Sequence, residues 1–225
     1  MKKKILKKPY FQDLPTQKKI ESKWKGQHIK VSICMLSYNH EKYLDEAISS
    51  VLLQKTNFPF ELLIHDDASQ DESQKIIATY ASQYPNIVKP ILQHENQHSK
   101  RINPSVHFNY PRCSGEYIAF LEGDDFWTDE NKLQSQVEAL DKYQNINLCF
   151  HKATRINYFN KNIKNITIGE YAAEDTVIPY KNIFFRTHGM VATGSCMIRS
   201  SAKENLQEFM KLRPYLTLGD LFMQF

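Results

Sequence analysis

Short apolar runs alternate with segments of helical spacing along most of the chain. Strands are predicted over residues 30–37, 60–65, 87–92, 117–121 and 147–151. Helices are predicted over 41–54, from Ser69 or Asp71 onward, over 104–110, and over 129–143 with an Asp N-cap. In the first of these helices the apolar positions 44, 47, 48, 51 and 52 share one face. The alternation indicates an α/β fold whose mostly parallel sheet carries helices on both faces.

Three of the predicted strands end in polar turns. The turns are Ser37-Tyr38-Asn39, Asp66-Asp67 and Glu122-Gly123-Asp124-Asp125. In open α/β sheets, ligands bind outside the carboxyl ends of the strands. The sequence therefore predicts that the three turns meet at one edge of the sheet and form one site.

The acidic turn has two interpretations. Carboxylates crowded at the end of a strand repel one another, and a cation among them removes the repulsion. Hard oxygen ligands of this kind suit Mg²⁺ or Mn²⁺, and Gly123 leaves room for a close approach. The alternative is a strand followed by an ordinary Asp-rich turn.

The other two turns suggest what the site would bind. The ring of Tyr38 offers a stacking surface for a base, and the carboxylate of Asp67 can accept a hydrogen bond from a ring N–H. An acid pair with a metal can hold a diphosphate. Neither G-x-G-x-x-G nor G-x-x-x-x-G-K-[ST] occurs in the sequence, which argues against a dinucleotide enzyme and a P-loop NTPase. The pattern favours a nucleoside-diphosphate pocket.

The order and spacing of three motifs resemble family 2 inverting glycosyltransferases, over about residues 29 to 225. The motifs are residues 31–39, 64–71 and 115–125, and the continuations Phe126-Trp127 and 132–134 fit the same pattern. The resemblance implies a Rossmann-like GT-A fold with its nucleotide-sugar site at the carboxyl ends of the strands. It also implies a hexosyltransferase-type enzyme that uses Mn²⁺ or Mg²⁺ and inverts the anomeric carbon. The donor would be a nucleoside-diphosphate sugar, in first place a UDP-sugar.

Site roles follow from the resemblance, position by position. Tyr38 would pack on the base, Asp67 would bind its ring N–H, and Asp66 would support the same turn. Asp124 would be the metal ligand, with Asp125 beside it on the sugar or on metal-bound water. Glu122 departs from the first acid of the family's D-x-D motif. The full predicted donor set is Ser37, Tyr38, Asn39, Asp66, Asp67, Lys100, Glu122, Gly123, Asp124 and Asp125, with Arg101 as an alternative to Lys100 on the phosphates.

The resemblance also implies a catalytic base downstream of the metal motif. Inverting transfer needs a carboxylate that takes the proton from the acceptor hydroxyl. Residues 218–222 resemble the element that carries it, so Asp220 is the candidate, although an Asp at a helix N-terminus is favoured by the macrodipole alone. His188 and Ser195 are candidate acceptor contacts. The acceptor would be a glycan or lipid-linked saccharide of cell-surface polysaccharide synthesis.

Charge and length suggest how the chain is organised. Residues 1–25 hold nine lysines against Asp13 and Glu21, a net +7, whereas the whole chain is +4. We therefore expect a basic, flexible tail over 1–28 and one transferase domain over 29–225, divided into a nucleotide-binding half (about 29–128) and an acceptor half (about 129–225). The apolar end after Asp220 suggests truncation there, which would affect activity.

The same features bear on location and partners. No signal peptide and no apolar run of about 20 residues is present, and the four cysteines suggest reduced thiols. We expect a cytoplasmic enzyme, with peripheral contact to anionic lipid through the lysines and no nucleic-acid partner.

Two other functions remain open from the sequence. One is a nucleotide-sugar-binding module without catalysis. The other is a sugar nucleotidyltransferase, which would need a Gly-rich basic loop after the first strand, where residues 38–41 are Tyr-Asn-His-Glu.

Overall fold

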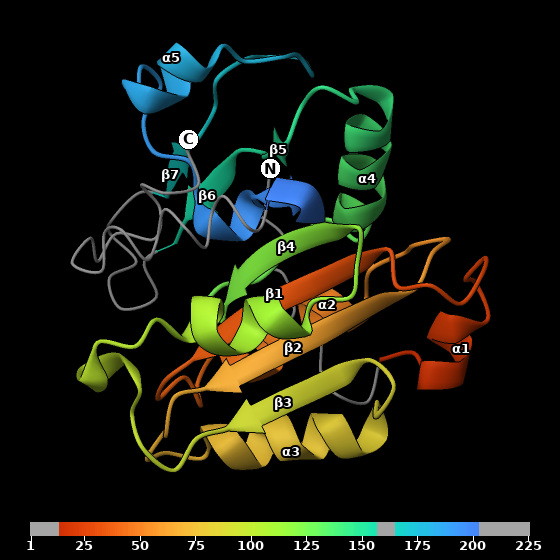
Figure 1. Cartoon of the computed structure of the whole chain (residues 1–225), viewed down its shortest axis with the longest axis vertical. Helices are drawn as coiled ribbons and strands as arrows, with labels where there is room; N and C mark the ends of the chain where they lie inside the picture. The colour runs from red at the N-terminus through yellow and green to blue at the C-terminus, as the bar shows by residue number, and fades with distance from the viewer. Residues whose placement is uncertain (1–13, 157–164, 203–225) are drawn as a thin grey trace, which may run out of the picture.

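The computed structural model describes residues 14–156 and 165–202, which form a six-stranded sheet with helical segments on both faces (Figure 1). The strand order is β3-β2-β1-β4-β8-β5. The parallel strands are β1 (Val31–Ser37), β2 (Phe60–Asp66), β3 (Val88–Leu92) and β4 (Tyr117–Glu122). Strand β8 (Met197–Arg199) pairs antiparallel with both β4 and β5 (Leu148–Cys149). The predicted α/β fold with a mostly parallel sheet is confirmed.

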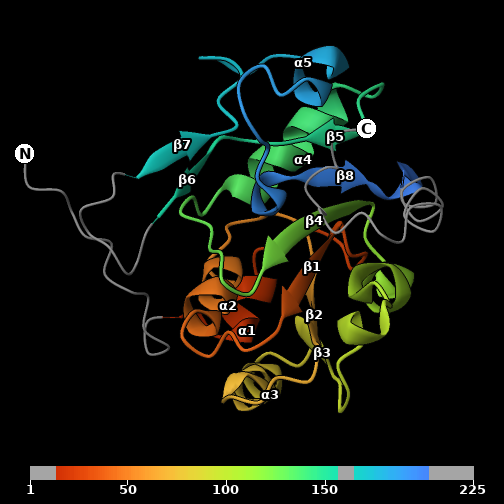
Figure 2. The ribbon, with the colours of Figure 1, turned by 90° about the vertical axis from the view of Figure 1, so that its left-hand side faces the viewer.

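The helices connect the strands as the alternation predicts. They are α1 (Gln17–Glu21), α2 (Leu44–Leu52), α3 (Ser73–Gln83), α4 (Lys132–Lys142) and α5 (Tyr180–Phe184). Short helical turns cover His98–Lys100, Ser105–Asn109, Tyr110–Arg112, Thr193–Ser195 and Ser200–Ala202. Figure 2 shows α1 and α2 on one side of the sheet and the turns that precede β4 on the other.

Alternation along the strands divides the apolar side chains between two cores. On one face, Ile33 and Met35 of β1 belong to the core that includes α2, α3 and α4. On the other face, Cys34 and Phe120 pack with Val106 and its neighbours in a smaller core. The predicted positions 44, 47, 48, 51 and 52 of α2 are all fully buried, so the helical face expected from their spacing is confirmed.

Several local features differ from the expectations. Helix α4 begins at Lys132 with Asn131 at its N-cap, and no side chain caps it. Asp129 instead accepts the N–H of Asn131 at 2.9 Å, so its carboxylate closes a turn just before the helix. The strand expected over 147–151 shortens to the two residues of β5. Strand β8 and the small sheet of β6 (Ala153–Arg155) and β7 (Ile166–Ile168) were not predicted.

The basic N-terminal segment is folded over at least part of its length. Ile20 of α1 is buried, and the ring of Trp24 meets that of Phe60 edge-on at 5.5 Å. The Tyr84 hydroxyl donates to the Pro15 carbonyl at 3.0 Å. The tail expected over 1–28 is therefore wrong for residues 14–28, because apolar residues between the lysines anchor them; residues 1–13 lie outside the described part.

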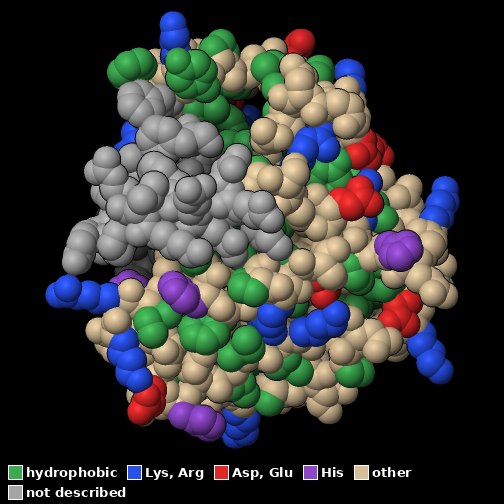
Figure 3. Space-filling view, in the orientation of Figure 1, with side chains coloured by type: hydrophobic (Ala, Val, Ile, Leu, Met, Phe, Trp, Pro, Cys, Tyr) green, Lys and Arg blue, Asp and Glu red, His purple; other side chains and the backbone are tan. Residues whose placement is uncertain are grey.

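Charged side chains lie on the surface without forming one large field of a single sign on the face shown in Figure 3. Lys, Arg, Asp and Glu are interspersed there with polar and apolar side chains.

Candidate functional site

The three polar turns meet at one edge of the sheet. Strand register aligns Ser37 with Asp66, and Leu36 with Glu122. The arrowheads of β2, β3 and β4 point the same way in Figure 1. The convergence predicted from the sequence is confirmed at the level of the backbone, and this edge is the candidate site.

Hydrogen bonds join the turn after β1 to the turn after β2. The Asn39 backbone, in the left-handed region at φ 55°, donates to Ser69 Oγ at 2.8 Å. The Asn39 side-chain oxygen accepts the Gln70 N–H at 2.8 Å, and the Asp67 N–H donates to the Ser37 carbonyl at 2.9 Å. Asn39 therefore holds the two turns together, which is a different use from the ligand contact expected for it.

The carboxylates of Asp66 and Asp67 are both buried, and both accept hydrogen bonds from neighbouring segments of the chain. Asp66 accepts from the Ser69 N–H at 2.9 Å and from the Gln74 side chain at 2.8 Å. Asp67 accepts the N–H groups of Gln97 at 2.7 Å and His98 at 3.0 Å. The contacts of Asp66 are of the kind expected for a residue that supports the turn. The carboxylate of Asp67 already accepts two backbone N–H groups, so it would bind a base through its remaining lone pairs.

At the same edge, Ser37 has a hydroxyl without a hydrogen-bond partner among the described residues, and Tyr38 has an exposed ring. Ser37 Oγ is buried and has no hydrogen-bond partner within the described residues. Tyr38 is 47% exposed, which is unusual for a large aromatic side chain so close to the core and leaves its ring accessible for stacking. Tyr38 is accessible to a base, whereas the Ser37 hydroxyl is covered, and the donor contacts of both residues stay predictions.

His65 is a site neighbour that the sequence argument missed. Its ring is fully buried and stacks on Phe108, with centroids 4.8 Å apart. His65 Nε2 lies 3.5 Å from Asp67 Oδ1, too far for a good hydrogen bond. Burial lowers the pKa of His65 although Asp67 acts in the opposite direction. His65 lies inside the 64–71 motif, but a role for it was not predicted; its place directly before the Asp pair was the only signal.

The acid turn is shaped by a close approach at Gly123. The Gly123 N–H donates to the Leu36 carbonyl at 2.8 Å. A Cβ at this position would stand 2.7 Å from His40 Nδ1 and 3.1 Å from the Leu36 oxygen. Glu122 and Asp124, on either side, are both exposed. Glycine is thus required here by space, and the carboxylates project from a backbone tied to β1.

A turn from the C-terminal half packs against the acid turn. A Cβ on Gly194 would lie 3.3 Å from Asp125 Oδ2, and Trp127 Nε1 donates to the Gly194 carbonyl at 2.7 Å. Gln136 of α4 donates to the Ser195 carbonyl at 2.9 Å. Trp127 and Gln136 therefore hold the 193–195 turn beside Asp125, and the two halves of the chain meet at this point.

The side chain of Ser195 does not face the edge. It is 1% exposed, and its hydroxyl donates to the Ala192 carbonyl at 2.7 Å. An acceptor could reach this hydroxyl only if the turn opened, and the expected acceptor contact stays a prediction. His188, the other candidate, packs on Tyr171 with ring centroids 5.3 Å apart.

Lys132 is a buried cation near the same turn. Its Nζ lies 3.8 Å from the centroid of the Trp127 ring and has no hydrogen-bond partner in the described part of the chain. Burial lowers the pKa of Lys132 to about 7, against smaller opposite effects of Cys196 and Cys149. Lys132 belongs to the 132–134 continuation of the family pattern, but the sequence does not show that its side chain is buried.

The remaining predicted residues lie in different situations. Lys100 is engaged in an ion pair with Glu95, so a phosphate would have to compete with that carboxylate. Asp220 lies outside the described residues.

The acid turn fits a divalent cation that a substrate helps to hold. Within residues 14–156 and 165–202, no group of three or more His, Cys, Asp and Glu side chains could hold a metal ion. Magnesium is commonly bound by one or two carboxylates together with substrate phosphates, and the exposed Asp124 with its acidic neighbours provides hard oxygen donors of that kind. The donor set therefore suits a cation bound together with a diphosphate.

The architecture is that of a nucleotide-sugar transferase of the GT-A class. The structure of S. aureus TarS 1–349 in complex with UDP superposes with a TM-score of 0.61 at 20% identity, over 87% of this chain and 54% of that one. The model of "Glycosyl transferase family 2" matches residues 32–206. The chain belongs to this glycosyltransferase family.

Curated relatives resemble half to two thirds of the chain. An uncharacterized protein of Mycobacterium tuberculosis strain H37Rv is 42% identical over 125 residues, covering 54% of this chain and 34% of the relative. The Escherichia coli UDP-Glc:alpha-D-GlcNAc-diphosphoundecaprenol beta-1,3-glucosyltransferase WfgD is 31% identical over 147 residues, covering 65% and 52%. The chain thus spans about a third to a half of the length of these relatives.

No helix among residues 14–156 and 165–202 combines the length and the apolar character that crossing a membrane requires.

Proposed function

We propose that this protein transfers a sugar from a nucleoside-diphosphate sugar, in first place a UDP-sugar, to a hydroxyl of a glycan or lipid-linked saccharide, with inversion at the anomeric carbon. The observation that carries the proposal is the alignment of the Tyr38, Asp67 and Asp124 turns at the carboxyl edge of a family 2 fold. The UDP complex of TarS and the lipid-diphosphate acceptor named for the E. coli glucosyltransferase support this donor and acceptor class.

Ser37, Tyr38 and Asp67 at the carboxyl edge of the sheet are proposed to bind different parts of the donor. Tyr38 stacks on the base through its exposed ring, and the Ser37 hydroxyl, which is buried without a partner, gains a hydrogen bond to the nucleotide. Asp67 accepts from the base while the 97–98 backbone keeps its carboxylate in place. This part of the site is preorganised, because the hydrogen bonds of Asn39 and Asp66 are already made.

The acid turn is proposed to hold the cation that neutralises the leaving diphosphate. Asp124, with Asp125 beside it, would hold a Mn²⁺ or Mg²⁺ ion. When bound, that ion supplies positive charge that neutralises the departing diphosphate. Trp127 holds the 193–195 turn next to the exposed Asp125. Asp220 is proposed as the base that takes the proton from the acceptor hydroxyl on the face opposite the leaving group.

The setting is proposed to be cell-surface polysaccharide synthesis on the cytoplasmic side of a membrane. An acceptor that is linked to a lipid, as in the name of the E. coli relative, would keep the enzyme at a membrane surface. Lysines near the N-terminus would add attraction to anionic lipid of roughly 1 kcal/mol each.

Thermal stability in the presence of nucleotides tests the donor assignment. UDP, GDP, dTDP and CDP are each added with Mn²⁺, Mg²⁺ or EDTA, and the midpoint of unfolding is measured. A nucleotide at about 100 times its Kd stabilises by roughly 2.7 kcal/mol, which is a shift of roughly 5–10 °C for a chain of this size. We expect the shift with UDP and metal, and a loss of most of it in EDTA.

The variant Asp124→Asn should lose the metal-dependent part of the shift. Asp175→Asn is the matched control, because it makes the same chemical change at an exposed position outside the edge. Equal shifts in both variants would exclude Asp124 as the ligand. Donor binding without any release of UDP from a UDP-sugar, whatever hydroxyl acceptor is offered, would identify a binding module instead of a transferase.

A further inference from the structure

A cavity of about 280 Å³ lies between α1 and α2, away from the nucleotide edge. Helix α2 starts just after the carboxyl end of β1 and runs back along the sheet, so its last turn at Leu52 lies toward the amino ends of the strands. Leu14, Ile20, Leu52 and Leu53 are apolar residues of its wall. The cavity is therefore separate from the site proposed for the donor.

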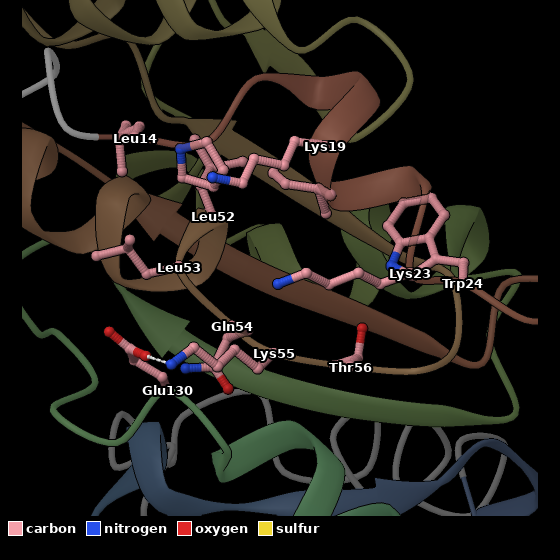
Figure 4. Close-up of a pocket in the computed structure, with 12 residues that line it drawn as sticks. Leu14, Lys19, Lys23, Trp24, Leu52, Leu53, Gln54, Lys55, Thr56 and Glu130 are labelled. Carbon is pink, nitrogen blue, oxygen red and sulfur yellow. Dashed lines mark ion pairs between the residues drawn. The ribbon is translucent and has the colours of Figure 1, made fainter.

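The polar part of the lining is cationic. Three lysines, at positions 19, 23 and 55, and one acid, Glu130, line it and leave a net charge of +2. Lys55 and Glu130 form an ion pair, drawn as a dashed line in Figure 4. The ammonium groups of Lys19 and Lys23 have no ion pair or hydrogen bond with any of the described residues, and Figure 4 shows the Lys23 side chain extending across the cavity.

A neutral donor without a partner adds to this charge. Trp24, also in the lining, has a buried Nε1 that makes no hydrogen bond within the described part of the chain. Buried N–H groups are normally paired, and an unpaired one costs about 1–3 kcal/mol. Beside one apolar wall the lining thus holds a buried indole N–H without a partner and two exposed ammonium groups without an ion pair among the described residues.

We propose that this cavity binds a phosphate group carried on an apolar chain. A phosphate monoester carries a charge of about −1.5 to −2 near neutral pH and three acceptor oxygens, which matches the net +2 and the free donors. The apolar wall accommodates the first carbons beyond the phosphate. Nucleotides are excluded as the preferred ligand because the described lining offers a single aromatic ring, half covered by its packing on Phe60. The site is independent of the proposed transferase activity.

The test compares the whole chain with two double variants of equal charge. Lys19→Gln with Lys23→Gln removes the free ammonium groups of the cavity. Lys18→Gln with Lys25→Gln removes two lysines of the same segment that are exposed like Lys19 and Lys23 but are not part of the lining. Binding is measured by calorimetry with inorganic phosphate, and by flotation with phosphatidylcholine vesicles with and without phosphatidic acid.

We expect the cavity variant to bind vesicles containing phosphatidic acid roughly 30-fold more weakly than the unchanged chain, since it loses two hydrogen bonds to the bound phosphate, each contributing about a fivefold factor. The control variant should lose much less. Saturable binding of inorganic phosphate that is lost only in the cavity variant supports the same site with a soluble phosphate-bearing ligand.

Two results would overturn the proposal. One is equal weakening in the two double variants, which would show general attraction of a basic segment. The other is absence of both phosphate and vesicle binding, which would mean that these lysines only complement the C-terminal carbonyls of α2. An unchanged UDP-dependent midpoint in both variants shows that the nucleotide edge is intact, so failure here is distinct from failure of the proposed function.

Discussion

Replacing Lys132 by methionine should stabilise the protein at neutral pH. Methionine keeps the length of the side chain and removes the ammonium group, which is buried, lacks a hydrogen-bond partner and lies over the Trp127 ring. The pKa of Lys132 is lowered from 10.5 to about 7 by burial. A difference of that size corresponds to roughly 5 kcal/mol at most between the two protonation states.

The sign follows from proton binding in the two states. Between pH 7 and 10.5 the unfolded chain holds the lysine proton and the folded chain does not, so this residue makes stability rise with pH across that window. Below pH 7 both states hold the proton, and the penalty is complete and constant. Loss of the cation–π contact offsets roughly 0.5–2 kcal/mol of the gain. We expect the methionine variant to be more stable by roughly 2–4 kcal/mol at pH 7, and the difference to vanish toward pH 10.

Denaturant unfolding of both proteins over this pH range measures the difference directly. Taking the difference removes the tyrosines and cysteines that titrate in the same window. Lys142→Met is the matched control, since Lys142 lies on the same helix, faces the ring of Tyr143 at 5.1 Å and is exposed; its effect should stay within about 0.5 kcal/mol. A Lys132 variant that is less stable at pH 7, or a difference that does not change with pH, would refute the reasoning.

Three further predictions rest on single contacts. Gly123→Ala should destabilise the protein by roughly 1–3 kcal/mol and weaken UDP binding, because its Cβ would meet His40 Nδ1 at 2.7 Å; an unchanged midpoint and affinity would contradict the steric argument. Although burial acts to raise it, hydrogen bonds from Lys89, Ser114 and Ser32 keep the pKa of Glu61 below its usual value. Glu61→Gln should thus cost roughly 1.5–3 kcal/mol at neutral pH, a difference that disappears in unfolding curves as the pH falls through the lowered pKa. Cys34 should resist iodoacetamide in the native protein at pH 8, since its hydrogen bond with the free thiol of Cys113 and its burial raise the pKa of the thiol; rapid labelling seen by mass spectrometry would show that the core opens.

The elements of the nucleotide-binding half could be predicted because their signals are local. Apolar spacing at positions 44 to 52 marks the buried face of α2, and the runs before Asp66 and Glu122 mark β2 and β4. Parallel strands of similar length have their carboxyl ends at one edge, so the meeting of the three turns followed from their order alone.

The part of the chain after residue 128 has weaker local sequence patterns. Strand β8 has only three residues and pairs with β4 and β5 across long separations in the sequence, so no periodicity reveals it. Asp129 precedes α4 and looks like an N-cap, yet its carboxylate is used by Asn131. Ser195 lies in a Gly- and Thr-rich stretch that suggests an exposed loop, but the contact of Gln136 with its carbonyl draws that turn inward.

The sequence by itself determined the class of fold, the family and the edge where the polar turns meet, because those depend on local spacing and on residue types in order. The tertiary structure decided how each side chain at that edge is used. The side-chain oxygens of Asn39 and Asp66 accept hydrogen bonds from neighbouring backbone N–H groups. Gly123 has no space for a side chain beside His40. The ammonium group of Lys132 is buried over the Trp127 ring. Burial and hydrogen-bond partners arise from segments far apart in the chain, and the energies of charged and polar groups depend on these surroundings more than on the residue type.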